Sequence, residues 1–144
     1  MSESRLTQQQ RQFIKQRANG CCEYCLSQAK FSPDPFSIEH IIPRSKGGTS
    51  DLDNLAIAAQ GCNNFKYSHS EAIDPVTGSS VPLYHPRQDN WSEHFTWSSD
   101  STQMLGLTPT GRATIDRLQL NREGVVNLRG VLHSIDLHPP HNDS

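Results

Sequence analysis

The sequence contains no long apolar run and no segment typical of a secretory signal. The 144-residue chain is 33% hydrophobic and has a mean hydropathy of −0.65. Its apolar runs are much shorter than the roughly 20 residues that span a bilayer. Its N-terminal stretch, MSESRLTQQQRQFIKQR, lacks the apolar centre of a signal peptide. We therefore expect a soluble, cytoplasmic protein that does not associate with membranes.

The chain also has little net charge, −2 at pH 7, which excludes a uniformly basic nucleic-acid-binding surface. The charge is unevenly spread, however. Residues 1–30 carry five basic and two acidic side chains, whereas residues 71–144 carry five arginines and nine acids. A polyanion would meet a local basic face near the N-terminus and bind in a salt-dependent way. An ordinary solvated helix explains the same pattern, so both interpretations stay open.

The first half of the chain predicts a helix, two strands and a second helix. TQQQRQFIKQRANG (residues 7–20) reads as a helix with Thr7 as its N-cap and Asn19-Gly20 as its stop. SIEHII is β-branched and ends at Pro43, and NLAIAA is a second apolar run. CNNFKYSHSEA starts a helix. We therefore predict an α+β fold with a β-β-α core over residues 1–70.

Residues 71–144 predict a C-terminal extension that packs on this core. The stretch DPVTGSSVPLYHPRQDN reads as irregular, and HFTWSSD, TQMLGLT and RATIDRL each look strand-like. NREGVVNLRGVLHSI has helical spacing, with Asn121 as a candidate cap. Trp91, Phe95 and Trp97 alternate with polar residues, so a small satellite core is favoured over stacking on bases. We expect His133, His138 and His141 to belong to a solvated tail.

Five polar residues of the central segment suit phosphodiester chemistry. A histidine can take a proton from water near neutral pH, and His40 follows Glu39 on the first predicted strand. A carboxylate and an amide oxygen are hard ligands suited to Mg²⁺, and Glu39 and Asn63 supply them. Asn54 could orient the imidazole, and Lys66 could meet a phosphate. Each of these residues, taken alone, is more often structural. Their occurrence together in one short segment favours an active site.

The segment closely resembles the HNH nuclease motif. The matching positions are Glu39-His40, IIP, the Gly-Gly loop, Asn54 and CNNFK. The resemblance implies a ββα-metal fold and hydrolysis of DNA, with nicking of one strand as one form. His40 would be the general base, oriented by Asn54, and Glu39 with Asn63 would hold Mg²⁺ or Mn²⁺. The products would carry 5′-phosphate and 3′-hydroxyl ends. The family more often has Asp at the first position and often has His at the last.

The loop between the predicted strands adds basic residues that would contact phosphates, namely Arg44 and Lys46. The chain has no separate sequence-reading motif such as a helix-turn-helix, so we expect low intrinsic specificity or guidance by a protein partner. The rival interpretation is a non-catalytic nucleic-acid-binding module on a degenerate HNH scaffold.

The four cysteines of the chain favour metal over disulfide, because an unexported protein keeps its thiols reduced. Many HNH relatives close a structural zinc site with two CxxC knuckles. Cys22 and Cys25 form a good first knuckle, but the second has Ala59 before Cys62. Three ligands remain where a closed zinc site takes four, and neither Cys21 nor His69 has the family spacing to substitute. We therefore predict a degenerate knuckle without stable zinc.

Overall fold

The structure is a computed structural model that describes residues 6–140, so His141 lies outside the described part. No helix in that part is long and apolar enough to cross a membrane. Short 3₁₀ turns occur at Ala29–Phe31, Arg44–Lys46 and Leu52–Asn54. The described helices and strands are α1 (Gln8–Arg17), β1 (Ser37–His40), β2 (Leu55–Ala58), α2 (Gln60–Lys66), β3 (Glu71–Ile73), β4 (Ser80–Pro82), α3 (Trp91–His94), β5 (Phe95–Trp97), β6 (Met104–Gly106), α4 (Pro109–Leu118) and α5 (Glu123–Ser134).

Helix α1 begins and ends where the sequence predicts. The Thr7 hydroxyl accepts from the Gln10 backbone N–H at 3.0 Å, and the Gln10 side chain accepts from the Thr7 N–H at 2.8 Å. This capping box satisfies two N–H groups that have no partner inside the helix. Asn19 and Gly20 have φ angles of 55° and 69°, which turn the chain out of the helix.

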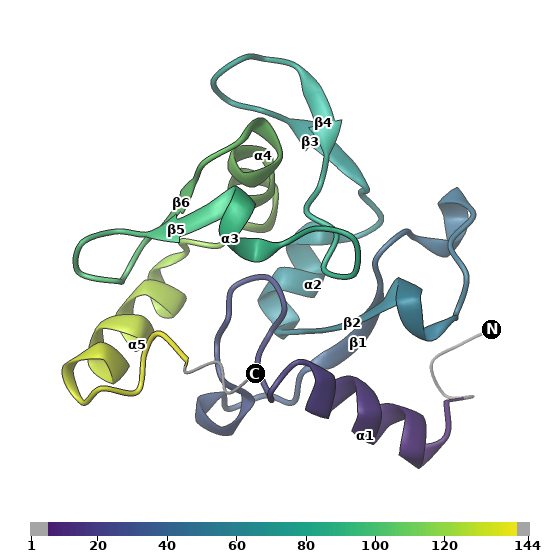
Figure 1. Ribbon diagram of the computed structural model, residues 1–144, viewed down its shortest axis with the longest axis horizontal. Coiled ribbons are helices and arrows are strands. Elements are labelled where there is room, and N and C mark those ends of the chain that lie inside the picture. Colours follow the sequence, from purple (N-terminus) through teal and green to yellow (C-terminus); the bar gives the residue numbers. More distant parts are fainter. Residues whose placement is uncertain (1–5, 141–144) are drawn as a thin grey trace.

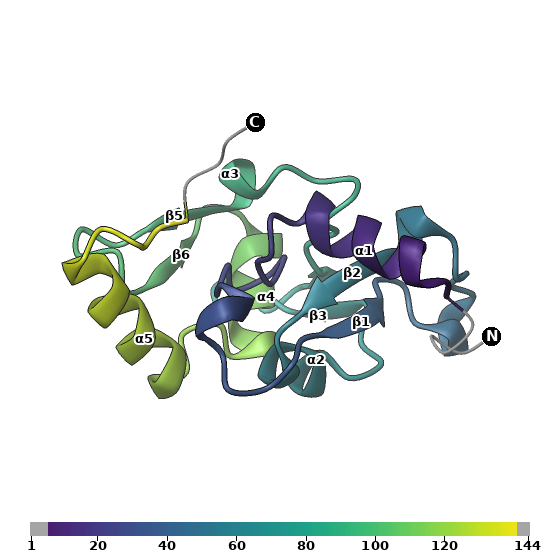
Figure 2. The same ribbon diagram turned by 90° about the horizontal axis from the view of Figure 1, so that it is seen from below.

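Strands β1 and β2 form an antiparallel hairpin that lies between α1 and α2 (Figures 1 and 2). Ile14 of α1 packs with Ile38, Leu55 and Ile57 of the hairpin in a small apolar core. Helix α2 begins at Gln60, earlier than predicted, and ends at Lys66. The element order and the hairpin agree with the prediction of two strands followed by a helix.

One predicted strand of the extension is a helix in the structure. The stretch RATIDRL is not a strand, because it lies in α4. Thr108 caps this helix by accepting from the Gly111 N–H at 3.0 Å, and Pro109 occupies its first turn, where proline is favoured. The β-branched Thr114 and Ile115 suggested a strand, but Thr114 and Leu118 are buried along one helix stripe.

Helix α5 is confirmed, although Asn121 is not its cap. Arg122 occupies the cap position, while the Asn121 amide accepts from the Met104 N–H at 2.8 Å and donates to the Met104 carbonyl at 2.9 Å. The side-chain amide of Asn121 therefore makes the two hydrogen bonds to β6 that the backbone of a neighbouring strand would otherwise make. The stretch predicted as irregular contains strand β4, which pairs with β3 just before it in the hairpin at the top of Figure 1.

The two halves of the chain share one main core. Helix α4 packs against α2, and Phe95 is buried in the main core while Trp91 and Trp97 are half-buried against it. His138 is buried rather than solvated, because its ring meets that of Trp97 at 4.6 Å and hydrogen-bonds the Ser101 carbonyl. The members of the core are Cys22, Tyr24, Cys25, Ala58, Ala59, Cys62, Leu83, Tyr84, Phe95, Met104, Leu118, Leu120 and Val125.

Candidate active site

Glu39 and His40 occupy the last two positions of β1, where it pairs with the beginning of β2. The register places Glu39 opposite Ala56 and His40 opposite Leu55. Successive side chains of a strand point to opposite faces, and the burial differs accordingly. Glu39 is 5% exposed, whereas His40 is half-buried. The strand therefore turns the carboxylate inward and leaves the imidazole partly open to solvent.

The Glu39 carboxylate is held by two buried donors. The Tyr24 hydroxyl donates to Oε1, and the Lys66 ammonium donates to Oε2 at 3.1 Å. Burial, followed by the negative charge of Glu39, raises the pKa of Tyr24 well above its usual value, so the phenol stays neutral and donates. Lys66 is 1% exposed and also donates to the carbonyl oxygens of Ile41 at 2.9 Å and His40 at 3.2 Å.

This arrangement corrects the expected role of Lys66. The prediction of a phosphate contact disagrees with the structure, because the ammonium points inward and each of its three donors already has an acceptor. Glu39, the predicted metal ligand, accepts from Lys66 on Oε2 and from Tyr24 on Oε1.

The imidazole of His40 contacts a serine that the sequence did not single out. Its Nε2 lies 3.0 Å from the Ser50 hydroxyl, in the loop that joins the two strands. If Nε2 carries the proton and donates to Ser50, then Nδ1 has a free lone pair. Ser50 therefore lies where it can set the tautomer of His40, ten residues away in sequence, which no local spacing rule would reveal.

Asn54 acts on the loop rather than on the imidazole. Its amide donates to the carbonyls of Thr49 at 2.7 Å and Ile42 at 3.1 Å, and its oxygen accepts from the Ile42 N–H at 2.9 Å. No bond to His40 is among these contacts, so the predicted direct orientation of His40 by Asn54 is corrected. A Cβ at Gly48 would lie 1.7 Å from the Ile42 oxygen, so only glycine permits this closure.

Arg44 and Lys46 form a short 3₁₀ turn in the same loop, and both are exposed. Gly47 ends the turn with a φ of 89°, a conformation that suits glycine. Both predicted phosphate-contacting cations therefore lie on the surface of the loop that also carries Ser50. Their positions agree with a contact to an extended polyanion, which stays a prediction.

Asn63 is half-buried and lies one turn before Lys66 on α2. Residues three apart on a helix share a face, and Lys66 reaches Glu39 of β1. The helix face that carries Asn63 is therefore directed toward the strand that carries Glu39 and His40. The pairing of Asn63 with Glu39 as ligands of one cation stays a proposal.

The three predicted knuckle cysteines converge. The Sγ atoms of Cys22, Cys25 and Cys62 lie within 4.8 Å of one another, and all three side chains are buried. They are placed to bind a metal ion. No histidine, cysteine or acid joins them as a fourth ligand within residues 6–140. The fourth knuckle position is Ala59, which packs in the same core, so these residues do not complete a closed four-ligand zinc site.

A basic side chain from the extension contacts the cluster instead. Arg122 donates from Nη1 to the Cys62 sulfur at 3.5 Å and to the Gln119 carbonyl at 3.1 Å. A Cβ at Gly61 would lie 2.7 Å from the guanidinium, so glycine makes room for it. Hydrogen bonds from the other two thiols lower the pKa of Cys25 well below its usual value, whereas burial raises that of Cys22.

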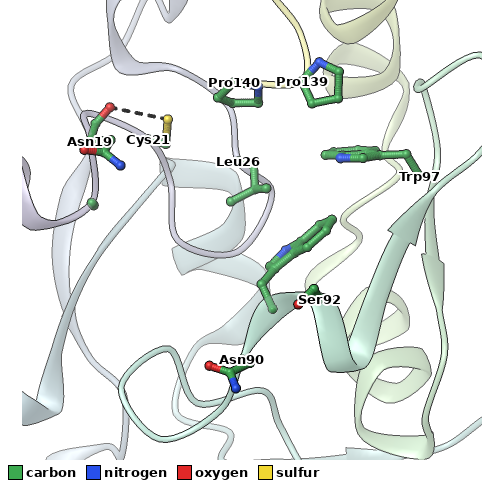
Figure 3. Close-up of a pocket in the computed structure, with 10 residues that line it drawn as sticks. Asn19, Cys21, Leu26, Asn90, Ser92, Trp97, Pro139 and Pro140 are labelled. Atoms are coloured by element: carbon green, nitrogen blue, oxygen red, sulfur yellow. Dashed lines mark hydrogen bonds between the residues drawn. The ribbon is translucent and has the colours of Figure 1, made fainter. Parts of the chain in front are cut away.

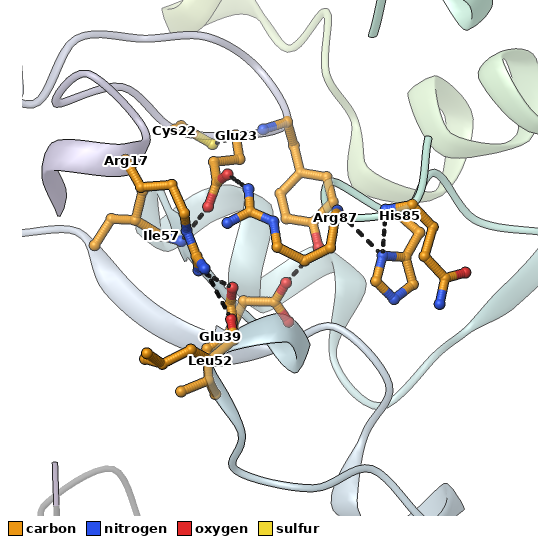
Figure 4. Close-up of polar contacts among 11 residues, drawn as sticks. Arg17, Cys22, Glu23, Glu39, Leu52, Ile57, His85 and Arg87 are labelled. Atoms are coloured by element: carbon orange, nitrogen blue, oxygen red, sulfur yellow. Dashed lines mark hydrogen bonds and ion pairs between the residues drawn. The ribbon is translucent and has the colours of Figure 1, made fainter. Parts of the chain in front are cut away.

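A second polar network, drawn in Figure 4, joins α1 and the extension to the hairpin. The Arg17 guanidinium donates to the carbonyls of Leu52 and Leu55 at 2.9 and 2.7 Å. Glu23 accepts from the Ile57 N–H at 3.0 Å and forms an ion pair with Arg87. Burial, and then the nearby charge of Arg17, lower the pKa of Arg87 to about 10. Apart from the basic N-terminal segment, no pattern in the sequence predicts this network.

Comparison with known proteins agrees with this geometry. Residues 22–69 match the model of the HNH endonuclease family, which covers the knuckle, the hairpin, the loop and α2. No curated protein and no solved structure gives a significant match to the chain. The similarity to the HNH endonuclease family therefore extends over residues 22–69, one third of the chain.

Proposed function

We propose that the protein is a metal-dependent endonuclease that hydrolyses DNA phosphodiester bonds, with His40 as the general base. The observation that carries the proposal is the half-buried imidazole, held through Nε2 by Ser50 at 3.0 Å at the end of β1. With Nε2 donating to Ser50, Nδ1 can take the proton of an attacking water. Asn54 supports this geometry indirectly by holding the loop that carries Ser50.

The side chains of Glu39 and Asn63 would hold the cation, Mg²⁺ or Mn²⁺. Their carboxylate and amide oxygens fit a hard divalent ion. A bound cation would polarise the scissile phosphate and stabilise the leaving 3′ oxygen. Cleavage by this chemistry gives 5′-phosphate and 3′-hydroxyl ends.

DNA contact would come from the loop surface. Arg44 and Lys46 are exposed there and would neutralise backbone phosphates on either side of the scissile bond. Phosphate contacts fix position without reading sequence. We therefore propose that selection of the cleavage site depends on a protein partner or remains weak.

One observation favours a second candidate, a non-catalytic nucleic-acid-binding module. The Lys66 ammonium lies 3.1 Å from the Glu39 carboxylate, so a protein cation already neutralises the ligand that the metal would need. In this alternative the Glu39–Lys66 ion pair is purely structural and His40 abstracts no proton.

Plasmid nicking separates the two candidates. Supercoiled plasmid is incubated with wild type, His40→Ala and His133→Ala, with Mg²⁺, Mn²⁺ or EDTA. His133 is an exposed histidine of α5 and serves as the matched control. We expect nicking by wild type and His133→Ala that EDTA abolishes, and a loss of roughly 100-fold or more in His40→Ala. Equal cleavage by His40→Ala would reject His40 as the base. Absence of cleavage with every metal, together with retained DNA binding, would favour the binding module.

A further inference from the structure

Two adjoining cavities form a groove away from His40, between the end of α1, the turn of the first knuckle and α3. Their volumes are about 480 and 170 Å³. We name them together the tryptophan groove, and Figure 3 shows the wider part. The residues that line both cavities are Ala18, Asn19, Cys21, Leu26 and Trp91.

The walls of the groove are flat and apolar. The rings of Trp91 and Trp97 lie 5.5 Å apart with an angle of 37° between their planes, and both side chains are half-buried. Figure 3 shows Pro139 next to the ring of Trp97 and Leu26 across the open space. The two indoles contact each other, and Phe95 packs beside Trp91 while His138 and Arg129 pack beside Trp97. A planar ligand would therefore stack on the ring surface that faces the cavity and not between the two indoles.

Leu26 reaches the groove from a strained backbone. Its φ is 61°, a left-handed conformation that a residue with a Cβ seldom adopts. The conformation belongs to the knuckle turn, in which the Leu26 N–H donates to the Cys22 carbonyl at 3.0 Å. A leucine kept in this conformation, with its side chain lining both cavities, suggests that the groove is a built feature of the fold.

Two buried donors at the groove have no partner within the described residues. They are Nε1 of Trp91, which lines both cavities, and Nε of Arg17, which lines the narrower one. Buried N–H groups are normally hydrogen-bonded, so these two favour a ligand with acceptors on its edges. The carboxamide oxygen of Asn90 and the Asn19 amide add polar groups at the rim of the wider cavity.

The narrow end of the groove adjoins the hairpin of the candidate active site. Arg17 donates to the Leu55 carbonyl at 2.7 Å, and Leu55 pairs with His40. A chain of nucleotides that passes Arg17 would therefore run from the active-site hairpin toward the two indoles. A proline-rich peptide also suits aromatic walls, but it offers no anion to the arginine end.

We propose that the tryptophan groove binds an unpaired nucleobase of the substrate, stacked on the indole of Trp91 or Trp97. The proposal rests on the proposed nuclease function, because it assigns to the same substrate a second contact beyond the scissile phosphate. Stacking on an indole tolerates any base sequence, because every base has a π-face. The groove would favour single-stranded, frayed or gapped DNA over an intact duplex.

Tryptophan fluorescence tests the proposal directly, because Trp91 and Trp97 are the two tryptophans of the chain. The protein is His40→Ala in EDTA, so that no cleavage occurs, and it is titrated with a dT oligonucleotide and with a blunt duplex. We expect the oligonucleotide to quench the fluorescence and the duplex to quench it less. In the same background, Trp97→Leu should bind a labelled oligonucleotide about 5- to 100-fold more weakly.

Trp91→Phe keeps a ring for packing and removes the unpartnered Nε1, and it should weaken binding by a smaller factor. Phe31→Leu, which removes a half-buried ring away from the groove, should bind as the parent does, and thermal melts check that each variant folds. Unchanged fluorescence, or unchanged affinity in both folded tryptophan variants, would overturn the proposal even if wild type nicks plasmid. Quenching by a proline-rich peptide alone would also overturn it. Quenching by the oligonucleotide without plasmid nicking would support the groove and count against the nuclease.

Discussion

Helix α2 lies between two groups of candidate metal ligands, and a protein cation contacts each group. On one side, the three thiols of the knuckle meet Arg122 at 3.5 Å. On the other, the Glu39 carboxylate meets Lys66 at 3.1 Å. The difference lies in burial and origin: Lys66 is fully buried within the HNH segment, while Arg122 is half-buried and belongs to the extension. A buried charge without a partner costs several kcal/mol, so the Glu39–Lys66 pair should matter for folding more than the contact between Arg122 and Cys62.

The largest effect is expected from Lys66→Met. This change leaves the Glu39 carboxylate buried beside Tyr24 without its ion-pair partner, and it removes two further hydrogen bonds to carbonyls. We expect the free energy of unfolding to fall by about 3–5 kcal/mol. Urea denaturation measures it. Lys46→Met, at an exposed position, should change stability by less than about 0.5 kcal/mol. Equal, small effects of both changes would mean that the buried Glu39–Lys66 pair contributes little to the stability of the fold.

The second prediction completes the knuckle with Ala59→Cys. Ala59 packs among the three thiols, so a cysteine there supplies the fourth ligand of a closed zinc site. We expect the wild-type chain to lose its zinc to a mild chelator and the variant to retain about one zinc per chain. Elemental analysis after dialysis measures the zinc content. Ala29→Cys, an exposed alanine outside the cluster, is the control. A wild-type chain that keeps a full equivalent of zinc would contradict this comparison.

The ion pair between Asp74 and Arg112 in the extension should determine part of the loss of folding stability at low pH. Arg112 donates to both oxygens of Asp74 at 2.9 Å and holds the pKa of that carboxyl well below its usual value of 3.8. A carboxyl with a lowered folded pKa stabilises the fold above pH 3.8, and this stabilisation is lost as the pH falls toward the folded value. The stability difference between wild type and Asp74→Asn should therefore be constant above about pH 5 and shrink below pH 4.

Thermal melts across pH 2–7 measure this dependence. Asp34→Asn, at an exposed position, should show a much smaller difference from wild type. A difference between wild type and Asp74→Asn that persists unchanged at pH 2 would mean that the geometry of the side chain, and not its charge, is what matters.

The smallest effect is expected from Lys46→Gln on DNA binding. If Lys46 contacts one phosphate, its loss should reduce the slope of log affinity against log salt by about 1. Binding of a labelled DNA by the His40→Ala background in EDTA, between 50 and 200 mM salt, measures this slope. Lys30→Gln, also exposed but outside the loop, should leave it unchanged. An unchanged slope in Lys46→Gln would remove the loop from the proposed DNA contact.

Most of the α1, β1, β2 and α2 order could be predicted, because the signals are local. Thr7, the Asn19-Gly20 pair and the two β-branched runs each act within a few residues of their own position. The α4 error shows the limit of this reasoning. Thr114 and Ile115 favour a strand by propensity, but the cap at Thr108 and burial against α2 decide for a helix.

In the candidate site, residue types could be predicted but several partners could not. The candidate roles of Glu39 and His40 follow from their residue types and the resemblance to the HNH motif, and those of the three cysteines from the resemblance alone; the structure brings the cysteines together. The inward position of Lys66 depends on Tyr24 and on carbonyls of another strand, which no pattern within α2 reveals. The contact between Arg122 and Cys62 joins residues 60 positions apart, so only the folded chain shows it.

Because the two halves of the chain share one core, the HNH segment depends on the extension for its folding. The knuckle thiols belong to the same main core as Phe95, Met104 and Leu118 of the extension, so the HNH segment does not close this core by itself. Expressed alone, residues 1–70 would expose that interior to water and aggregate. The HNH segment is therefore not expected to fold as an independent domain, and fusion proteins that use it should include the extension.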